Sequence, residues 1–377
     1  MIYLDYSATT PVSKEVLDSY IKVTKEYIGN PNSLHSLGMK SNELLTSATK
    51  QISELLDIKT DEIVYTSGST EANNLAILGY CLKNAKKGKN IVISKLEHPS
   101  IYGICDYLKT QGFTISYVEN TKEGLIDFDD LAKKVTDDTI LVSIVAVNSE
   151  LGIRQPLKTL RQIIKKQNES TVLHSDMTQA VGKVNINLHD VDMASMSGHK
   201  IYGPKGIGML YKNEKIQLEP IIHGSEDTLR SGTPSVPLII AFSKALRLAI
   251  TNEAKNESVV KLLNEKLTAT IAKYPKIMIN KTNYSIPHIF NLSLMNIRPE
   301  TFIHALEKRD IYIGSNTACS KGKTSSTILA VYGDETRANT SLRISLSHLT
   351  SFDDINKFLY SFDIVYNKLL ELGWENE

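Results

Sequence analysis

The stretch "EIVYTSGSTEANNLAILGYCLKNAKKGKNIVIS" (62–94) contains, in order, a short β-branched strand, a turn of small residues, a helix and a second strand. The helix starts at Ser and Thr residues and ends at Gly, which are typical boundary residues. Strands and helices keep alternating downstream, and several strands are apolar on both faces. We therefore predict an α/β fold with a mostly parallel sheet sandwiched by helices. Further strands are predicted at "FTISYVEN" (113–120), "TILVSIVAVN" (139–148), "TVLHSD" (171–176) and "DMASMSG" (192–198), with a helix at 157–167.

The pattern changes after about residue 255. A helix over 258–273 is followed by a strand at "HIFNLSL", a helix after Pro299, a strand at "SLRISLS" and a long C-terminal helix. This mixture predicts a smaller α+β domain that also takes the N-terminal strand. We expect a large domain over residues 14–257 and a small domain formed by residues 1–13 plus 258–377. A cleft between two domains is a common ligand site.

Composition and charge argue against nucleic-acid binding, membrane binding and secretion for this chain of 377 residues. Its 43 basic and 42 acidic side chains give a net charge of +1, which offers no electrostatic case for binding nucleic acid or an anionic membrane. The N-terminus lacks the basic and apolar segments of a secretory signal, and no apolar run is long enough to span a bilayer. We expect a cytoplasmic protein.

The three cysteines, Cys81, Cys105 and Cys319, form no closely spaced pair, so neither a disulfide framework nor a metal site is expected. Cys319 lies in "GSNTACSKGKTSST" (314–327), among residues that favour turns and solvent, although free cysteines are usually buried. Lys321 and Lys323 would favour its thiolate, unless they are simply solvated charges.

Four stretches follow predicted strands, where open α/β sheets bind ligands. In "YTSGSTEANN" (65–74), the N–H groups of a helix start and the hydroxyls of Ser69 and Thr70 suit a phosphate. Taken by itself, this stretch favours a second interpretation, in which the side chain of Ser69 or Thr70 only caps the helix. In "LEHPS" (96–100), His98 directly follows a strand, where a lone histidine is most often structural.

The other two stretches carry an acid and a lysine. In "HSDMTQAVG" (174–182), Asp176 suits a protonated ring nitrogen and Gln179 a nearby oxygen, unless they cap a helix. In "SGHKIYGPKGIGMLY" (197–211), Lys200 follows a strand beside Ser197, His199 and several glycines. Schiff-base lysines need such placement, whereas most lysines are solvated. Together, the four stretches match the binding set of pyridoxal 5'-phosphate.

These motifs resemble those of the cysteine desulfurases, fold type I pyridoxal-phosphate enzymes of the aminotransferase class V group. The resemblance covers nearly the whole chain, and the motifs stand in the family order. Besides the four stretches above, it includes "IYLDYSATTPV" (2–12), "GNPNSLHSLG" (29–38), "RSGT" (230–233), "TAC" (317–319) and "SLRISLS" (341–347).

The resemblance implies a role for each matching residue. Lys200 would hold the cofactor covalently, Asp176 its ring nitrogen and Gln179 its ring oxygen. His98 would stack on the ring and assist proton transfer, and Arg343 would bind the substrate carboxylate. The cofactor phosphate would be bound by Ser69, Thr70, Ser197 and His199, and by Thr233 from the second subunit of a homodimer.

The implied reaction converts L-cysteine to L-alanine, with the sulfur passing to Cys319 as a persulfide. An acceptor protein of iron–sulfur cluster assembly or tRNA thiolation would then take the sulfur. Two alternatives are a selenocysteine lyase, or another class V lyase or aminotransferase, and a non-catalytic sulfur-transfer scaffold.

Two departures from the family pattern stand out. The family has Asn-Asn-Glu where this chain has Asn148, Ser149 and Glu150. We therefore expect the substrate contacts of Asn148 and Ser149 to differ from those of the two asparagines in the family. The glycine-rich stretch before "RSGT" is shortened to "HGSEDTL" (223–229), which affects the placement of Thr233.

Overall fold

A computed structural model describes residues 1–224, 228–315 and 324–371. Its large sheet has the strand order β2-β8-β7-β6-β5-β3-β4. Strands β7, β6, β5, β3 and β4 run parallel, and β8 lies antiparallel to β7 and β2. The strands are β2 (Ile63–Thr66), β3 (Asn90–Ser94), β4 (Thr114–Val118), β5 (Thr139–Ser143), β6 (Val172–Asp176), β7 (Met193–Ser197) and β8 (Gly208–Lys212).

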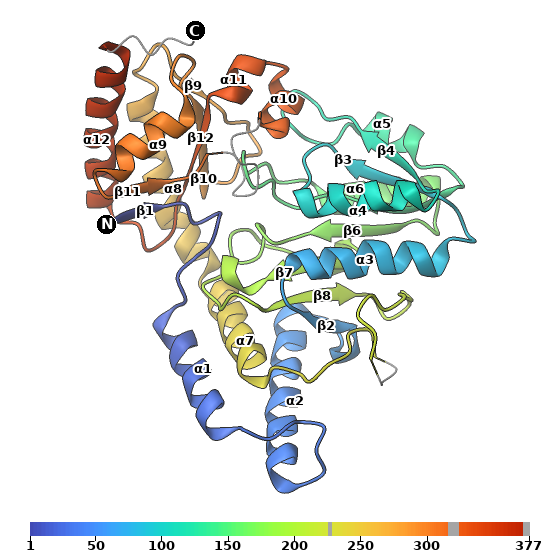
Figure 1. Cartoon of the computed structure of the whole chain (residues 1–377). Helices are drawn as coiled ribbons and strands as arrows, with labels where there is room; N and C mark the ends of the chain where they lie inside the picture. The colour runs from blue at the N-terminus through green and yellow to red at the C-terminus, as the bar shows by residue number, and fades with distance from the viewer. Residues whose placement is uncertain (225–227, 316–323, 372–377) are drawn as a thin grey trace.

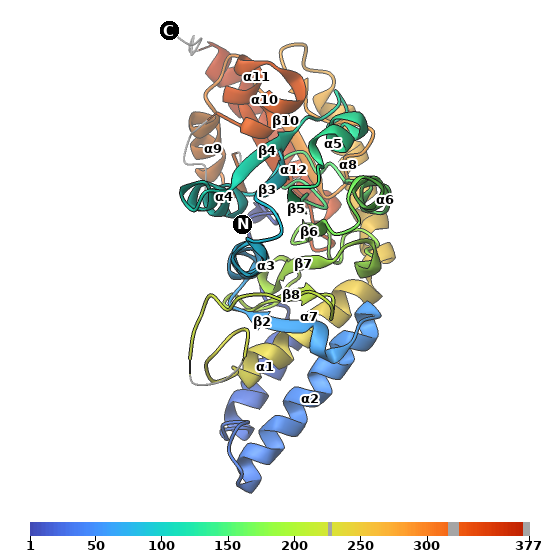
Figure 2. The same cartoon turned by 90° about the vertical axis from the view of Figure 1, so that its right-hand side faces the viewer.

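Both faces of the large sheet are apolar and covered by helices. In β3, Ile91 and Ile93 pack in one core and Val92 in another, because successive side chains point to opposite faces. Helices α3 (Ser69–Asn84) and α4 (Pro99–Thr110) cover the first face. The second is covered by α5 (Phe128–Lys134), α6 (Leu157–Gln167) and α7 (Val236–Thr251) (Figure 2). The predicted fold class is confirmed.

Helices α1 (Lys14–Glu26) and α2 (Ser36–Leu56) pack against α7 and extend beyond the sheet at the bottom of Figure 1. Ser13 begins α1 by accepting a hydrogen bond from the Val16 N–H, as an N-cap residue does. The apolar residues Ala48 and Ile52 of α2 join the core of the second sheet face.

The remaining elements form a second body with its own core. Strands β9 (Met278–Ile279), β10 (Ile289–Ser293) and β12 (Ser341–Ser345) make an antiparallel sheet, and β1 (Ile2–Leu4) pairs in parallel with β11 (Ile311–Ile313). Three helices pack against these strands: α8 (Glu253–Ile271), α9 (Pro299–Glu307) and α12 (Phe352–Glu371) (Figure 1). This separate core supports the proposed division into two domains.

Two short helices, α10 (Ser326–Tyr332) and α11 (Glu335–Asn339), join the two bodies. Ile328 and Val331 of α10 pack with Leu96 and Ile153, which follow strands of the large sheet. Helix α10 thereby lies at the edge of the sheet where the predicted site residues lie.

Among the helices that the structure describes, none combines the length and apolar character needed to cross a membrane. Within the same residues, no group of three or more His, Cys, Asp or Glu side chains is arranged to hold a metal ion.

Candidate active site

A cavity of about 230 Å³ lies at the carboxyl end of the large sheet. Asp176 is the last residue of β6, Lys200 comes three residues after β7, and Arg343 reaches in from β12 of the second body. Residues far apart in the sequence therefore meet at one edge, as expected for open α/β sheets. The predicted residues that line the cavity are Ser69, Thr70, His98, Ser149, Asp176, Gln179, His199, Lys200 and Arg343.

The Lys200 side chain points to the N-terminal segment. Its Nζ donates to the main-chain oxygens of Ser7, at 2.6 Å, and Ala8, at 2.7 Å. Both residues line the cavity and follow β1, so the N-terminal motif forms one wall of the site. The alternative that Lys200 is a solvated surface lysine is therefore wrong.

The Asp176 carboxylate is buried and held by two donors. Its Oδ1 accepts the Thr178 N–H at 2.9 Å, and its Oδ2 accepts Nδ2 of Asn73 at 2.9 Å. Neither of these two donors is charged, and Asp176 also lines the cavity, where a cationic group could pair with it. Asn73, on the second turn of α3, was not anticipated from the sequence.

His98 begins α4 and faces the cavity. Its Nδ1 accepts the Ser100 N–H at 3.2 Å and lies 2.9 Å from the Ser100 hydroxyl. Burial lowers the pKa of His98, so the ring is neutral near pH 7 and carries its proton on Nε2. His98 therefore has a structural role as the cap of α4, and this role involves only its Nδ1 atom.

The side-chain amide of Gln179 is oriented by two partners. Its Nε2 donates to the Ser7 carbonyl at 2.9 Å, and its Oε1 accepts Nζ of Lys183 at 2.9 Å. Lys183 is buried, and its burial together with the nearby Lys200 and Arg343 cations lowers its pKa to about 7. The spacing of four residues between Gln179 and Lys183 is the only sequence signal for this pair.

Replacing Lys183 with methionine is expected to change how stability depends on pH. Between the ordinary pKa of 10.5 and about 7, the unfolded chain takes up a proton that folded Lys183 does not. The parent therefore loses stability as pH falls through this window, by up to about 5 kcal/mol, since each pKa unit is worth about 1.4 kcal/mol. Relative to that of the parent, the denaturation midpoint of Lys183→Met should rise as pH falls from 10.5 to about 7.

The matched control for Lys183 is Lys158→Met, which removes an exposed lysine. If the stability curves of the Lys183 variant and the parent ran parallel from pH 7 to 10.5, Lys183 would not be a neutral buried amine.

The start of α3 is suited to an anion. Gly68 occupies the N-cap position and has no side chain to cap the helix, so the first N–H groups stay available beside Ser69 and Thr70. The interpretation that Ser69 or Thr70 caps α3 is therefore wrong. At Gly208 a Cβ would lie 2.6 Å from the Gly68 Cα, so glycine allows β8 to approach this turn.

Ser197 and His199 lie near the same turn. A Cβ on Gly68 would be 3.7 Å from the Ser197 hydroxyl, so this hydroxyl faces the turn. Nδ1 of His199 lies 3.1 Å from the Thr9 hydroxyl, and burial, with the Lys200 charge, lowers the His199 pKa to about 4. His199 is therefore neutral at pH 7.

Arg343 is buried beside the cavity. Its Nη2 donates to Asp5 Oδ1 at 2.8 Å and its Nη1 to the Ser149 carbonyl at 3.1 Å, whereas its Nε has no hydrogen-bond partner among the described residues. A Cβ at Gly314 would lie 2.6 Å from Asp5 Oδ1, so glycine makes room for this ion pair. Because Ser149 contributes its main chain here, the departure from asparagine leaves this contact intact.

Three predicted residues that the structure describes, Asn148, Ser197 and Thr233, do not line the cavity. Asn148 does not line the cavity; its side chain holds the 148–151 turn by accepting the Glu150 and Leu151 N–H groups. Thr233 lines a separate cavity of about 380 Å³, which Lys200 does not line. Cys319 and residues 225–227 of the shortened stretch lie outside the described residues.

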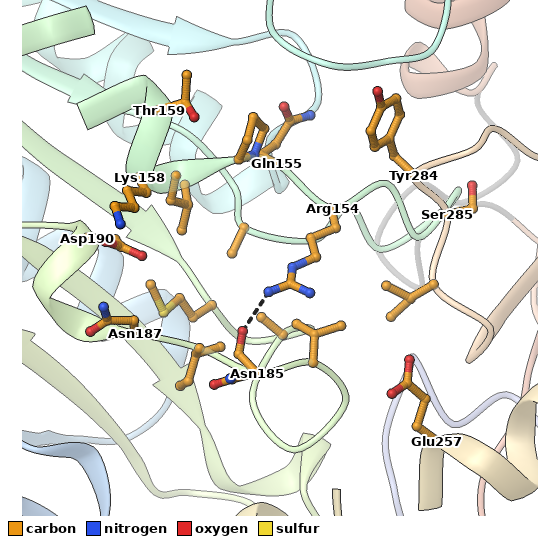
Figure 3. A pocket seen from close by; sticks show the side chains of 18 of the residues that line it. Arg154, Gln155, Lys158, Thr159, Asn185, Asn187, Asp190, Glu257, Tyr284 and Ser285 are labelled. Carbon is orange, nitrogen blue, oxygen red and sulfur yellow. Dashed lines mark hydrogen bonds between the residues drawn. The ribbon is translucent and has the colours of Figure 1, made fainter. Parts of the chain in front are cut away.

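Figure 3 shows a different cavity of about 540 Å³, and Met177, Ala180 and Val184 are among the residues that line it. Arg154 crosses it and donates to the Asn185 carbonyl at 2.7 Å. The side chains that line this cavity carry both signs of charge, from Lys158 and Arg154 and from Asp190 and Glu257, and none of the predicted site residues is among them. The smaller cavity is therefore the candidate active site.

Comparison with known proteins establishes the family. The family model for aminotransferase class V matches residues 2–358. The chain belongs to the class V aminotransferase family. The chain is 33% identical to the cysteine desulfurase IscS 1 of Archaeoglobus fulgidus, with 99% of each chain covered.

Two solved structures agree with this assignment. A NifS-like protein superposes with a TM-score of 0.92 and 30% identity, covering 98% of this chain and 99% of the other. SspA in complex with cysteine gives a TM-score of 0.80 and 28% identity, covering 93% of this chain and 100% of the other. The family resemblance seen in the motifs is confirmed.

Proposed function

We propose that this member of the class V family is a cysteine desulfurase that moves sulfur from L-cysteine to Cys319 and releases L-alanine. The observation that carries the proposal is the meeting of Lys200, Asp176, His98 and Arg343 around one cavity. The names of the relatives support the same activity, and one structural neighbour is described in complex with cysteine.

The residues present fit pyridoxal 5'-phosphate. A buried carboxylate, an amine and an uncapped helix start around one cavity provide partners for a ring nitrogen, an aldehyde and a phosphate. Lys200 would bind the aldehyde, Asp176 the ring nitrogen and Gln179 the ring oxygen. The start of α3, with Ser69, Thr70, Ser197 and His199, would bind the phosphate. When bound, the cofactor stabilises negative charge on the substrate α-carbon.

The side chains around the cavity then divide the remaining work. Arg343, held by Asp5 and the Ser149 carbonyl, binds the substrate carboxylate with its remaining N–H groups. The Lys200 amine takes the substrate α-proton. His98 is placed to exchange a proton through Nε2, because Nδ1 is used by Ser100.

Cys319 is the proposed nucleophile. Its thiolate attacks the substrate sulfur, an S–S bond forms, and the substrate C–S bond breaks with its electron pair left on carbon, which then takes a proton. The other cysteines are unsuited to this step: Cys81 and Cys105 are buried, and burial raises the pKa of both thiols, that of Cys105 to about 12.

We propose further that the protein is a homodimer in which Thr233 reaches the phosphate site of the partner. The position of Thr233 at a different cavity from that of its own Lys200 supports this. The persulfide sulfur would pass to an acceptor protein of iron–sulfur cluster assembly or tRNA thiolation in the cytoplasm.

Mass spectrometry after incubation with one equivalent of L-cysteine tests the function. We expect one extra sulfur on the peptide that contains Cys319, none on Cys81 or Cys105, and an equal amount of alanine. Sulfide release without a modified Cys319 would contradict the proposal. Consumption of L-selenocysteine but not of L-cysteine would indicate a selenocysteine lyase instead.

A further inference from the structure

Asn73 is a completely buried polar residue of α3 whose amide nitrogen serves two different parts of the site. Its Nδ2 donates to Asp176 Oδ2 at 2.9 Å and to the Ser100 hydroxyl oxygen at 3.0 Å. Its Oδ1 has no hydrogen-bond partner among the described residues. A buried amide oxygen without a partner costs stability, so the contacts of the nitrogen, and not those of the oxygen, explain why an amide stands here.

The contact with Asp176 fixes which end of the Asn73 amide faces the site. An ionised carboxylate only accepts hydrogen bonds, so the group next to Asp176 Oδ2 must be the amide nitrogen. The second N–H of the same nitrogen is then directed to Ser100, which lies in the first turn of α4. Asn73 therefore connects the end of β6 with the start of α4.

Ser100 extends this connection to His98. Because the Ser100 hydroxyl oxygen accepts the Asn73 N–H, its own proton points away from Asn73. Among the described residues, the only acceptor within hydrogen-bond distance of that proton is His98 Nδ1, at 2.9 Å from the oxygen. Nδ1 also accepts the Ser100 main-chain N–H at 3.2 Å. Two donors of Ser100 therefore face Nδ1, and the ring carries its proton on Nε2.

We propose that Asn73 and Ser100 are positioning residues that link Asp176 to His98 and hold the His98 ring with its Nε2–H on the side of the cavity. This inference rests on the proposed function, in which Asp176 binds the cofactor ring nitrogen and His98 exchanges a proton through Nε2. Neither Asn73 nor Ser100 lines the cavity, so both act through these two residues and not on the substrate.

Loss of the Ser100 hydroxyl should make His98 easier to protonate. A donor to Nδ1 stabilises the neutral ring and opposes a proton on that atom, so removal of the donor raises the pKa of His98. Burial has the largest effect on this pKa and lowers it; among the charged groups that act on the ring, Asp176 raises the pKa and Lys200 lowers it. Ser100→Ala leaves these three influences in place, so the change in the pKa reports the hydroxyl alone.

The test follows the His98 ring in the holoenzyme by nitrogen-15 NMR of labelled histidine, with His98→Gln to assign its signals, and measures kcat for L-cysteine. In the parent we expect a ring protonated on Nε2. Ser100→Ala should raise the pH at which the ring becomes charged by about 0.4 to 1 pH unit and lower kcat by about 2- to 10-fold, which is the effect of one hydrogen bond between uncharged groups. Ser100→Thr keeps the hydroxyl and should restore both values.

A double variant tests whether Asn73 acts through Ser100. Asn73→Leu should raise the protonation midpoint of His98 when the Ser100 hydroxyl is present, because that hydroxyl is then free to turn away from Nδ1. In the Ser100→Ala background, Asn73→Leu should raise the midpoint no further, since its connection to His98 is already absent.

Ser116→Ala is the matched control. It breaks another serine–asparagine hydrogen bond, from the Ser116 hydroxyl to Asn90 Oδ1 at 2.9 Å, at the end of β3 opposite to His98, and should leave the NMR signals and kcat at the parent level.

A His98 midpoint in Ser100→Ala equal to that of the parent would overturn the proposal, as would an equal shift by Asn73→Leu with and without the Ser100 hydroxyl. If Asn73→Leu does not fold, Asn73→Ala takes its place under the same criteria. A parent that released no alanine from L-cysteine, but whose His98 midpoint responded as expected, would refute the proposed function and leave the link between Asp176 and His98 in place.

Discussion

Lys200→Ala is expected to lower cysteine desulfurase activity by at least about 10³-fold, because loss of a proton-transfer group alone costs about 10²–10⁴-fold and the covalent hold on the cofactor is lost as well. The purified variant should also lack the visible absorption of a lysine-bound cofactor. Activity is measured as alanine released from L-cysteine, and the bound cofactor by absorption of the dialysed protein.

Lys205→Ala provides the control for Lys200, because Lys205 is an exposed lysine in the same glycine-rich turn. It should retain both the absorption and the activity of the parent. A Lys200→Ala protein that kept the parent absorption after dialysis would show that another amine, such as that of Lys183, holds the cofactor.

The sequence predicts well those features that depend on local pattern. The alternating β-branched and helical segments predict the layered sheet, and Asp176, His98 and Lys200 each stand at the end of a strand or within four residues after it. Because strands of a mostly parallel sheet end at the same edge, their meeting follows from the topology. The capping alternative at Ser69 and Thr70 was decided by the structure, since sequence does not show which residue occupies the N-cap position.

The partners of these residues were not predictable, because they depend on contacts between distant segments. Asn73 binds Asp176, and Lys200 donates to Ser7, across more than a hundred residues in each case. Glu150 meets Ser325 only because α10 returns to the large sheet. Patterns of period 2 or 3.6 describe which face of an element is buried and carry no information about such pairings.

Arg343→Ala is expected to lower kcat/KM for L-cysteine by about 10- to 100-fold or more, since a hydrogen bond to a charged group is worth about 1.5–3 kcal/mol. The substitution should also reduce stability by about 1–3 kcal/mol, because the Asp5 carboxylate loses its only described cationic partner at 2.8 Å. Steady-state kinetics and denaturation midpoints measure the two effects separately.

The double variant Asp5→Ala/Arg343→Ala separates the two roles of Arg343. Removal of both members of an ion pair leaves no unpaired charge behind, so the double variant should recover part of the lost stability. It should recover none of the lost kcat/KM, because the guanidinium that binds the substrate carboxylate is still missing. If Asp5→Ala restored activity to Arg343→Ala, the loss of activity would come from the unpaired Asp5 carboxylate repelling the substrate, and Arg343 would serve to neutralise Asp5 and would not itself bind the substrate carboxylate.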